Sequence, residues 1–250
     1  MHVSEFYNKA ATNYALFRRP QKEFEAIGHF LSFSQRRILD AGCGHGDVSR
    51  YIASKGKKVT AIDISTELIQ IASSVRVDGC SFQVADMQQF QPDAGTLFDS
   101  VVFFYSLIHN TKDETVSILR HISQFLNPTH SSLFVAVHSN SLNSDCVTRV
   151  VVPSQFSDEQ VELYLWSMEA LYQVFFDLGM SRIEISVRRP ESNELPFPRI
   201  YAKGYKSHGV PLTSCETLVD GVTIHRLANY EVVFFDFGYY MWSPRINGLL

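Results

Sequence analysis

The chain has 250 residues, 45% of them hydrophobic, which is enough for one sizeable domain or for one domain with an appendage. Its formal net charge of −4 lacks the basic excess with which proteins grip a nucleic-acid backbone, so no nucleic-acid partner is expected. The four cysteines lie far apart without a Cys-x-x-Cys pair, which argues against a metal site and fits a reducing cytoplasm.

Two helices are predicted within residues 1–33. Apolar side chains recur at three- and four-residue spacing from Phe6 to Phe17, as on one face of a helix. Pro20 interrupts this pattern, and a second apolar stripe runs from Phe24 to Leu31.

Strands and helices alternate from Arg37 onwards. Ser65 is a predicted N-cap, and the unbroken apolar run from Val101 to Phe104 is typical of a central strand buried on both faces. Strands are predicted at 37–41, 58–63, 81–86, 98–105 and 132–138, and helices at 47–54, 67–75 and 112–125. Such alternation predicts an α/β fold with a parallel, doubly wound sheet and helices on both faces.

The C-terminal part is less regular. Residues 145–157 do not read as one element, whereas 158–178 is predicted to be a helix that ends at Gly179. Two further strands, 183–188 and 199–206, are expected to form an antiparallel pair. Beyond them, 217–224 and 230–241 are predicted to form β structure.

A glycine-rich turn joins the first strand to the helix that follows it. The segment Asp40-Ala-Gly-Cys-Gly-His-Gly46 has the spacing Gly-x-Gly-x-Gly. Glycines allow a sharp turn and close approach of a ligand, and the helix N-terminus behind them favours a negative group. A dinucleotide dehydrogenase would instead need its third glycine at position 47, where this chain has Asp47.

Two more carboxylates stand at the ends of the next strands. Asp63, about twenty residues beyond the glycines, can accept from both hydroxyl groups of a ribose, or it can cap the helix before Ser65. Asp86 can accept from an exocyclic amine such as that of adenine while Met87 lies against the ring, or the two can be a solvated turn residue and a core residue. Ligands of open α/β sheets bind where these strand ends meet.

These motifs resemble those of class I S-adenosylmethionine-dependent methyltransferases. Residues 38–47 resemble motif I, 59–64 the acidic motif, 84–87 the adenine motif, and 98–109 the motif of the fourth strand. The resemblance spans residues 1–206 and implies a Rossmann-like, seven-stranded, mostly parallel sheet in the order 3-2-1-4-5-7-6, with residues 1–33 as a helical lid. It leaves 207–250 as a C-terminal β-rich extension. It also implies a site for S-adenosyl-L-methionine, with S-adenosyl-L-homocysteine as product, formed by Asp40, Gly42, Cys43, Gly44, Asp63, Ile64, Asp86, Met87, Phe104, Tyr105 and Tyr14.

The same resemblance predicts a small-molecule O- or N-methyltransferase, with a protein or RNA methyltransferase, or a non-methylating cofactor-binding protein, as alternatives. His109, beyond the fourth strand, and His138, at the end of the fifth, are candidate general bases or structural histidines. Tyr7, Trp166 and Tyr201 are candidate contacts of an aromatic or apolar acceptor, or ordinary core residues.

Location and assembly are predicted from absent signals and from the tail. The N-terminus has no signal-peptide pattern and no apolar run is long enough to span a membrane, so a soluble cytoplasmic protein without membrane partners is expected. The aromatic stretch 230–242 is expected to cover the acceptor pocket, to pack on the domain or to form a homodimer contact.

Overall fold

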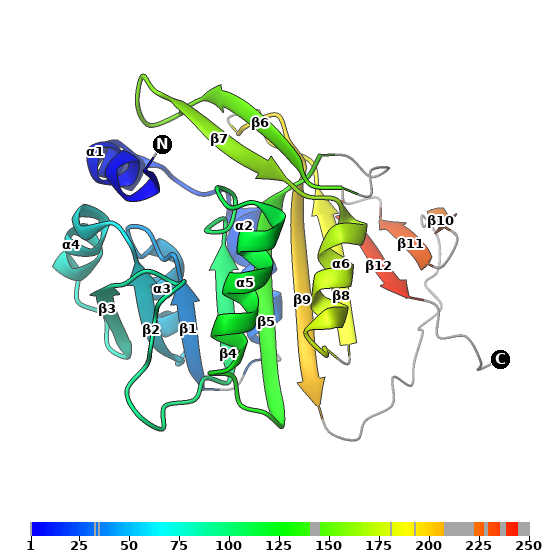
Figure 1. The fold of residues 1–250 in the computed structure, drawn as a ribbon, viewed down its shortest axis with the longest axis horizontal. Helices are drawn as coiled ribbons and strands as arrows, with labels where there is room; N and C mark the ends of the chain where they lie inside the picture. The colour runs from blue at the N-terminus through cyan, green and yellow to red at the C-terminus, as the bar shows by residue number, and fades with distance from the viewer. Residues whose placement is uncertain are drawn as a thin grey trace.

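The computed structural model describes residues 2–32, 34, 36–140, 146–180, 182–192, 194–207, 223–227, 230–235 and 239–244. Ten strands form one sheet in the order β10-β11-β12-β8-β9-β5-β4-β1-β2-β3, and β6 pairs with β7 in a separate hairpin. Figure 1 shows helices on both sides of this sheet, with α1 at one end of the molecule and β10–β12 at the other.

The strands of the first half are parallel and short. They are β1 (Arg37–Ala41), β2 (Lys58–Asp63), β3 (Cys80–Val84), β4 (Ser100–Phe104) and β5 (His130–His138). Two strands, β9 (Arg199–Ser207) and β8 (Arg182–Arg188), then follow at the β5 edge, with β9 antiparallel to both of its neighbours. In chain numbering these seven strands have the order 3-2-1-4-5-9-8, which differs from the predicted 3-2-1-4-5-7-6 because the separate β6–β7 hairpin, which the sequence did not predict, precedes the last two strands.

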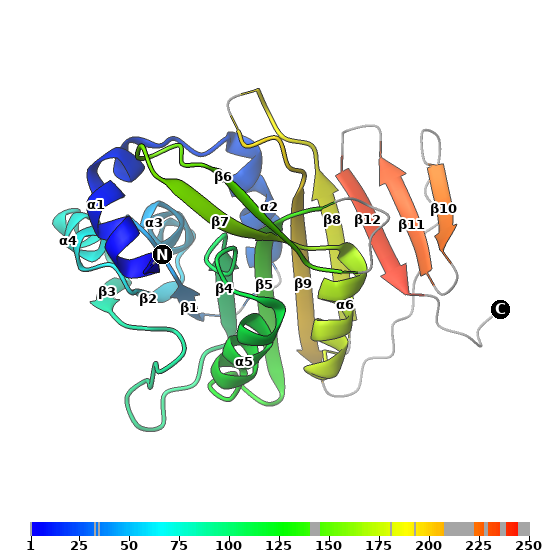
Figure 2. The same cartoon turned by 45° about the horizontal axis from the view of Figure 1, so that its top comes forward.

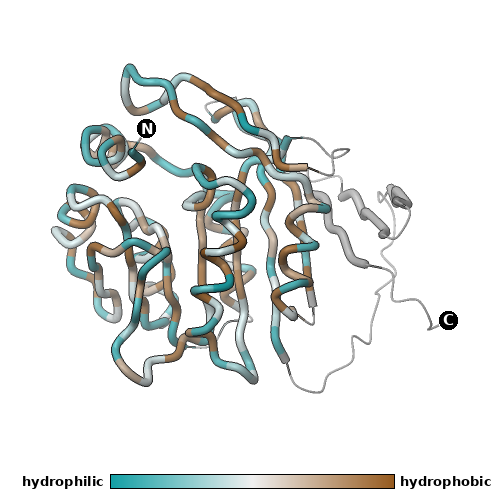
Figure 3. Tube along the Cα trace, viewed as in Figure 1, coloured by the Kyte–Doolittle hydropathy of each residue, from teal (hydrophilic) through white to brown (hydrophobic). Residues whose placement is uncertain are grey.

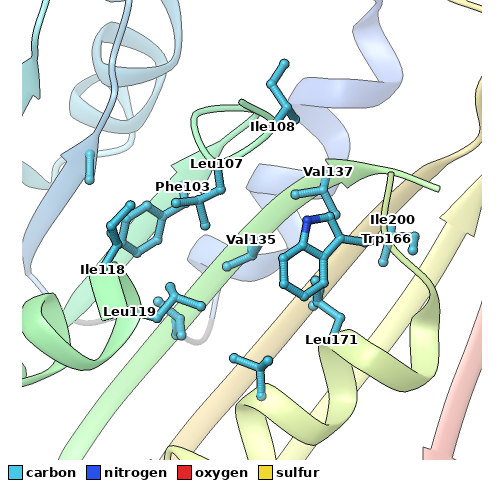
Figure 4. Packing of buried hydrophobic residues seen from close by; sticks show 14 of the residues in the cluster. Phe103, Leu107, Ile108, Ile118, Leu119, Val135, Val137, Trp166, Leu171 and Ile200 are labelled. Atoms are coloured by element: carbon cyan, nitrogen blue, oxygen red, sulfur yellow. The ribbon is translucent and has the colours of Figure 1, made fainter. Parts of the chain in front are cut away.

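Helices cover both faces of the sheet and divide the core in two. They are α1 (Val3–Leu16), α2 (Gln21–Leu31), α3 (Asp47–Ser54), α4 (Thr66–Ser74), α5 (Lys112–Ser123) and α6 (Met168–Asp177). Apolar side chains of α2 and α3 pack with Ile38, Val102 and Phe134 of the sheet, whereas those of α5 and α6 pack with Phe103 and Val135 on the other face, as Figure 4 shows. Hydrophobic and hydrophilic residues alternate along α5 and α6 in Figure 3, as expected for helices with one face on a sheet.

Side-chain caps fix where several helices begin. The Ser65 hydroxyl accepts from the amide of Leu68 at the start of α4, which confirms the predicted N-cap. Thr111 and Glu114 form a reciprocal capping box at the start of α5. Among the described residues, no helix has the length and apolar character needed to cross a membrane.

The predicted helix 158–178 is wrong for residues 158–167, nearly half of its length. Residues Gln160–Leu165 form strand β7, which pairs antiparallel with β6 (Thr148–Pro153), and α6 starts only at Met168 behind the N-cap Ser167. The reason is the two-residue period of this segment, where Val161 and Leu163 are buried and Glu162 is not. Figure 2 shows the β6–β7 hairpin lying beside α1.

The C-terminal extension continues the sheet. Strand β12 (Tyr239–Pro244) pairs antiparallel with β8, and β11 (Tyr230–Phe235) and β10 (Thr223–Leu227) follow in order. The predicted seven-stranded sheet with a C-terminal β-rich extension is confirmed, and the extension adds three strands at the β8 edge. The predicted β structure is confirmed for the described part of the tail, whereas residues 217–222 lie outside the described residues.

Candidate active site

The glycine turn after β1 has a backbone that side chains would not tolerate. Gly42 has φ +80° and Gly44 φ +57°, both in the left-handed region that favours glycine. A Cβ atom on Gly42 would lie 2.2 Å from the Cβ atom of Ser106. The amide nitrogens of Gly42 and Cys43 both donate to the carbonyl oxygen of Ile62, at 2.8 and 2.9 Å, which ties the turn to β2.

Asp63 fastens the same turn from the end of β2. Its carboxylate accepts from the amide of Gly44 at 2.8 Å and from the amide of Ser65 at 2.9 Å. Burial raises the pKa of this carboxyl, and the amides of Ser65, Gly44 and Ile64 oppose the shift. The N-cap of α4 is Ser65, so Asp63 holds the loop before the helix and the glycine turn, and its contact with a ribose stays a prediction.

Asp40 lies beneath the turn and is fully buried. Its Oδ2 atom accepts from the Ser49 hydroxyl, whereas Oδ1 has no hydrogen-bond partner among the residues that the structure describes. Burial raises the pKa of Asp40 to about 7, with the Ser49 hydrogen bond opposing the shift. Cys43 is also buried, and burial raises the pKa of its thiol.

The next strand ends carry the remaining predicted cofactor residues. The carboxylate of Asp86 accepts from the amide of Gln88 at 2.8 Å, and Met87 is partly buried against the core. Phe104 is buried at the end of β4. Tyr105, which follows it, has φ +57°, a conformation that is uncommon for a residue other than glycine and that concentrates at functional sites.

Helix α1 covers the glycine turn with aromatic side chains. The ring of Tyr14 lies so close to Gly44 that a Cβ atom there would come within 3.0 Å of its Cε1 atom. The Tyr14 hydroxyl accepts from Arg19 at 3.2 Å, and Arg19 forms an ion pair with Asp47 at 2.7 Å. The Arg19 guanidinium also stands 5.0 Å from the centre of the Phe104 ring, a cation–π contact.

A cavity opens between α1, the β6–β7 hairpin and the ends of β4 and β5. Its volume is about 100 Å³, below the roughly 300–1,000 Å³ of typical ligand pockets, so a ligand of that size requires α1 or the hairpin to shift. Aromatic rings and charged groups share its wall. The lining residues include Phe6, Tyr7, Tyr14, Phe17, Arg19, Glu23, Tyr105, His109, His138, Phe156, Glu194 and Arg199.

His109 and Tyr7 form a hydrogen-bonded side-chain pair in this wall. The Tyr7 hydroxyl lies 2.8 Å from Nε2 of His109, and Nδ1 of the same ring lies 2.8 Å from the carbonyl oxygen of Glu162 in β7. Burial lowers the pKa of His109, and the Glu162 carbonyl and carboxylate oppose the shift. Burial raises the pKa of Tyr7 well above its usual value.

His138 lies on the other side of the cavity. Its ring stacks on Tyr105 with centroids 5.1 Å apart. Burial, followed by the positive charge of Arg199, lowers the pKa of His138 to about 3, so the ring is neutral at physiological pH. The cavity therefore has two neutral histidines in its wall.

A buried charged network lies behind this wall. Glu23 of α2 accepts from the hydroxyls of Tyr105 at 2.9 Å and Tyr201 at 3.0 Å, and it forms an ion pair with Arg188 of β8. Arg188 also pairs with Glu194. The network ties α2 to β4, β8 and β9, and it makes the inner wall of the cavity rigid and polar.

Five of the predicted site residues line the cavity, whereas the other predicted cofactor residues, at the glycine turn and the strand ends, are not part of its lining. Tyr7, Tyr14, Tyr105, His109 and His138 all line the cavity. Tyr201 stands behind it in the Glu23 network. Trp166 is fully buried in the core against Val137 and Ile200 (Figure 4), away from the cavity, which gives no support to its predicted contact with substrate.

Sequence reasoning missed Arg19 and Glu23. Glu23 lies on the apolar stripe of the second helix, and this position was a usable signal, because a buried carboxylate needs a hydrogen-bond or ion-pair partner. Arg19 next to Pro20 offered no comparable signal.

The glycine turn and the two acidic strand ends lie at the carboxyl ends of three adjacent parallel strands. This arrangement defines a doubly wound α/β protein, and open sheets of this kind bind ligands at the edge where these strand ends meet.

Comparisons with known proteins find methyltransferases that are similar to parts of this chain. Residues 38–129 match a family model described as a methyltransferase domain. The Bacillus subtilis protein YqeM, named as a methyltransferase, is 32% identical over 136 residues, which are 52% of this chain and 52% of the relative. A ubiquinone biosynthesis O-methyltransferase of Xanthomonas oryzae is 35% identical over 123 residues, 44% of this chain and 49% of the relative. The chain thus spans about half the length of the curated relatives that it matches.

Solved structures agree on the fold. Magnesium protoporphyrin IX methyltransferase from Synechocystis PCC 6803, crystallised with S-adenosylhomocysteine, matches with a TM-score of 0.60 at 15% identity, over 82% of this chain and 98% of that one. This match shows that the chain has the fold of that methyltransferase, and residues 38–129, which match the methyltransferase-domain model, contain the motifs from which the sequence predicts such a domain.

Proposed function

We propose that this protein transfers a methyl group from S-adenosyl-L-methionine to an oxygen or nitrogen atom of a small, aromatic or apolar molecule. The observation that carries this proposal is the joint placement of the glycine turn, Asp63 and Asp86 at adjacent strand ends, beside an aromatic cavity with a buried histidine. The family and the O-methyltransferase names of several relatives support it.

The residues of the glycine turn fit the proposed cofactor. A left-handed turn closed against Ser106 and Tyr14 leaves backbone, and no side chain, facing the ligand. Asp63 keeps unused acceptor capacity for ribose hydroxyls beyond its two amide contacts, and Asp40 offers the unpaired Oδ1 atom. When bound, the cofactor supplies a methyl group activated by a sulfonium sulfur, and the protein supplies position and electrostatics.

The cavity wall fits an aromatic or apolar acceptor. Phe6, Phe17 and Phe156 offer ring surfaces, and Tyr7 and His109 offer polar atoms that can orient a nucleophilic oxygen or nitrogen. We assign the role of candidate base to His109, since its neutral ring stands in the wall with a hydrogen-bonded partner. His138 lines the same cavity and is proposed to position the acceptor through its contact with Tyr105.

Titration calorimetry with S-adenosylmethionine and S-adenosylhomocysteine tests the cofactor site. Asp63→Ala should weaken binding at least tenfold, about 1.4 kcal/mol, because both ribose contacts and the tie to Gly44 are lost. The exposed Asp93→Asn, in a loop outside the cavity, is the matched control and should bind as the wild type does. A wild-type protein that binds neither compound at millimolar concentration would overturn the proposal.

Transfer of an isotope-labelled methyl group to a panel of phenols, aromatic acids and aromatic amines tests the activity. A labelled product that depends on His109 supports the small-molecule proposal. Tight cofactor binding without any labelled product would favour the non-methylating alternative.

A further inference from the structure

The hydrogen bonds of His109 fix which of its nitrogens carries the proton. Nδ1 faces the carbonyl oxygen of Glu162, which can only accept, so Nδ1 must be the donor. The ring is neutral at physiological pH because burial lowers its pKa, and its Nε2 atom is therefore an acceptor. The Tyr7 hydroxyl must then donate to Nε2. The direction of this chain of hydrogen bonds follows from the backbone of the β6–β7 hairpin.

We propose that Tyr7 and His109 form a proton relay for a hydroxyl acceptor, in which the acceptor contacts the Tyr7 oxygen and His109 Nε2 receives the proton. This inference rests on the proposed methyltransferase function and narrows its acceptor to an aromatic compound with a hydroxyl group. Tyr7 lines the cavity, and after donating to His109 its oxygen has free lone pairs with which to accept from an incoming hydroxyl group.

The step balances in atoms and charges. A bond forms between the acceptor oxygen and the methyl carbon while the carbon–sulfur bond of the sulfonium donor breaks, which leaves a neutral thioether. The acceptor proton moves to Tyr7 Oη as the Tyr7 proton moves to His109 Nε2. The resulting imidazolium, hydrogen-bonded to the Glu162 carbonyl, then loses one proton to water.

The occupied Nε2 atom separates this relay from direct base catalysis. An acceptor can reach His109 only through Tyr7 or by displacing the Tyr7 hydroxyl, because the two atoms lie 2.8 Å apart. Tyr7 is part of α1, and its ring packs edge-on against Tyr14 with centroids 5.5 Å apart. The covering helix thus carries one member of the relay, so the relay is complete only when α1 is in place.

Nitrogen-15 NMR of the histidine rings tests the direction of the hydrogen bonds. We expect His109 to be protonated at Nδ1 and unprotonated at Nε2 at neutral pH, in the wild type and in Tyr7→Phe. A proton on Nε2, or a doubly protonated ring, would overturn the relay. His109→Asn, whose amide can still donate to Glu162, identifies the signal.

Absorbance titration of 4-nitrophenol with the S-adenosylhomocysteine complex tests the proton transfer, because the anion of this probe is coloured. The wild type should shift the titration of the bound probe down by at least about one pH unit, a tenfold increase in the ratio of anion to phenol. Tyr7→Phe and His109→Asn should both abolish the shift, and their double variant should do no more. Tyr51→Phe, on α3 outside the cavity, is the control and should behave as the wild type.

Each other outcome is decisive. A shift that survives in Tyr7→Phe but not in His109→Asn would show direct base catalysis and overturn the relay. No shift in the wild type would overturn the hydroxyl acceptor. Binding of S-adenosylhomocysteine is measured in the same samples. Loss of that binding would overturn the cofactor proposal, and it is thereby distinguished from a failure of the relay.

Discussion

Burial keeps both cavity histidines neutral, and buried neutral histidines lower the free energy of unfolding at acidic pH. A histidine whose pKa is lower in the folded than in the unfolded protein favours unfolding as pH falls below the unfolded value of 6.5. For His138 the loss begins near pH 6.5 and continues down to its folded pKa of about 3. Stability should therefore rise with pH through this window.

His138→Gln should make the protein less sensitive to acid. Between pH 7 and pH 5 the wild type should lose about 2 kcal/mol of unfolding free energy through His138 alone, and the variant should not. Urea unfolding at the two pH values measures this difference. The exposed His130→Gln is the control and should keep the wild-type pH dependence; an unchanged slope in His138→Gln would contradict the assignment.

Asp40 should release protons when the cofactor site fills. Its pKa of about 7 leaves it roughly half protonated at neutral pH, and the ammonium group of S-adenosylhomocysteine near the glycine turn would favour the carboxylate. Calorimetry at pH 7 in two buffers of different ionisation enthalpy should then report about half a proton released per molecule bound. Asp40→Asn should remove the buffer dependence, and a wild type without such dependence would refute the idea.

The local sequence pattern was enough to predict some site residues but not others. The glycine turn, Asp63 and Asp86 could be predicted because each follows directly from the end of its own strand. The pairing of Glu23 with Arg188 joins residues 165 positions apart, and only the closed sheet brings them together. No periodicity encodes such a contact.

Two elements from distant parts of the chain cover the cavity together. Helix α1 is held on one side by Asn8, which accepts from the Ser65 hydroxyl at 2.7 Å. On the other side Asn13 donates to the carbonyl oxygen of Phe156 at 3.0 Å, in the turn of the β6–β7 hairpin. The apolar spacing predicts helix α1 but the sequence does not predict the hairpin, because residues 145–157 show no regular pattern and β7 falls within the predicted helix 158–178.

Phe156→Ala should loosen this cover without unfolding the sheet. The Phe156 ring contacts Tyr14 at a centroid distance of 4.8 Å and Phe17 at 5.7 Å, and losing both aromatic pairs removes roughly 1–3 kcal/mol from the closed state. Hydrogen exchange in residues 3–16 should accelerate roughly tenfold while exchange in β1 and β4 stays unchanged. Phe176→Ala, on the exposed face of α6, is the control; equal protection of α1 in both variants would argue against a shared cover.

At the scale of the whole molecule, the sheet divides into a part that holds the site and a part that protects its edge. We propose residues 1–206 as the cofactor-binding domain, because every described residue that lines the cavity precedes position 200. Among the described residues, none of β10–β12 lines the cavity. The prediction that the tail covers the acceptor pocket therefore gains no support. The position of these strands in the sheet is instead that of an edge extension.

Truncation after Ser207 tests this division. Residues Ile185–Arg188 of β8 pair in register with Trp242–Tyr239 of β12, so the deletion leaves backbone groups of β8 without their strand partner, and such an edge recruits another chain. The truncated protein should self-associate in analytical ultracentrifugation, whereas a control chain that ends at Pro244 and keeps β12 should sediment as the full chain does. In the fraction that remains monodisperse, affinity for S-adenosylhomocysteine should change by less than about twofold, because the glycine turn, Asp63 and α1 are all retained.

A truncated protein that is monodisperse throughout would show that β8 needs no edge protection. A truncated protein that loses affinity for the cofactor would show that the extension is part of the site. Self-association of the full chain that the truncation abolishes would instead favour the extension as a homodimer contact.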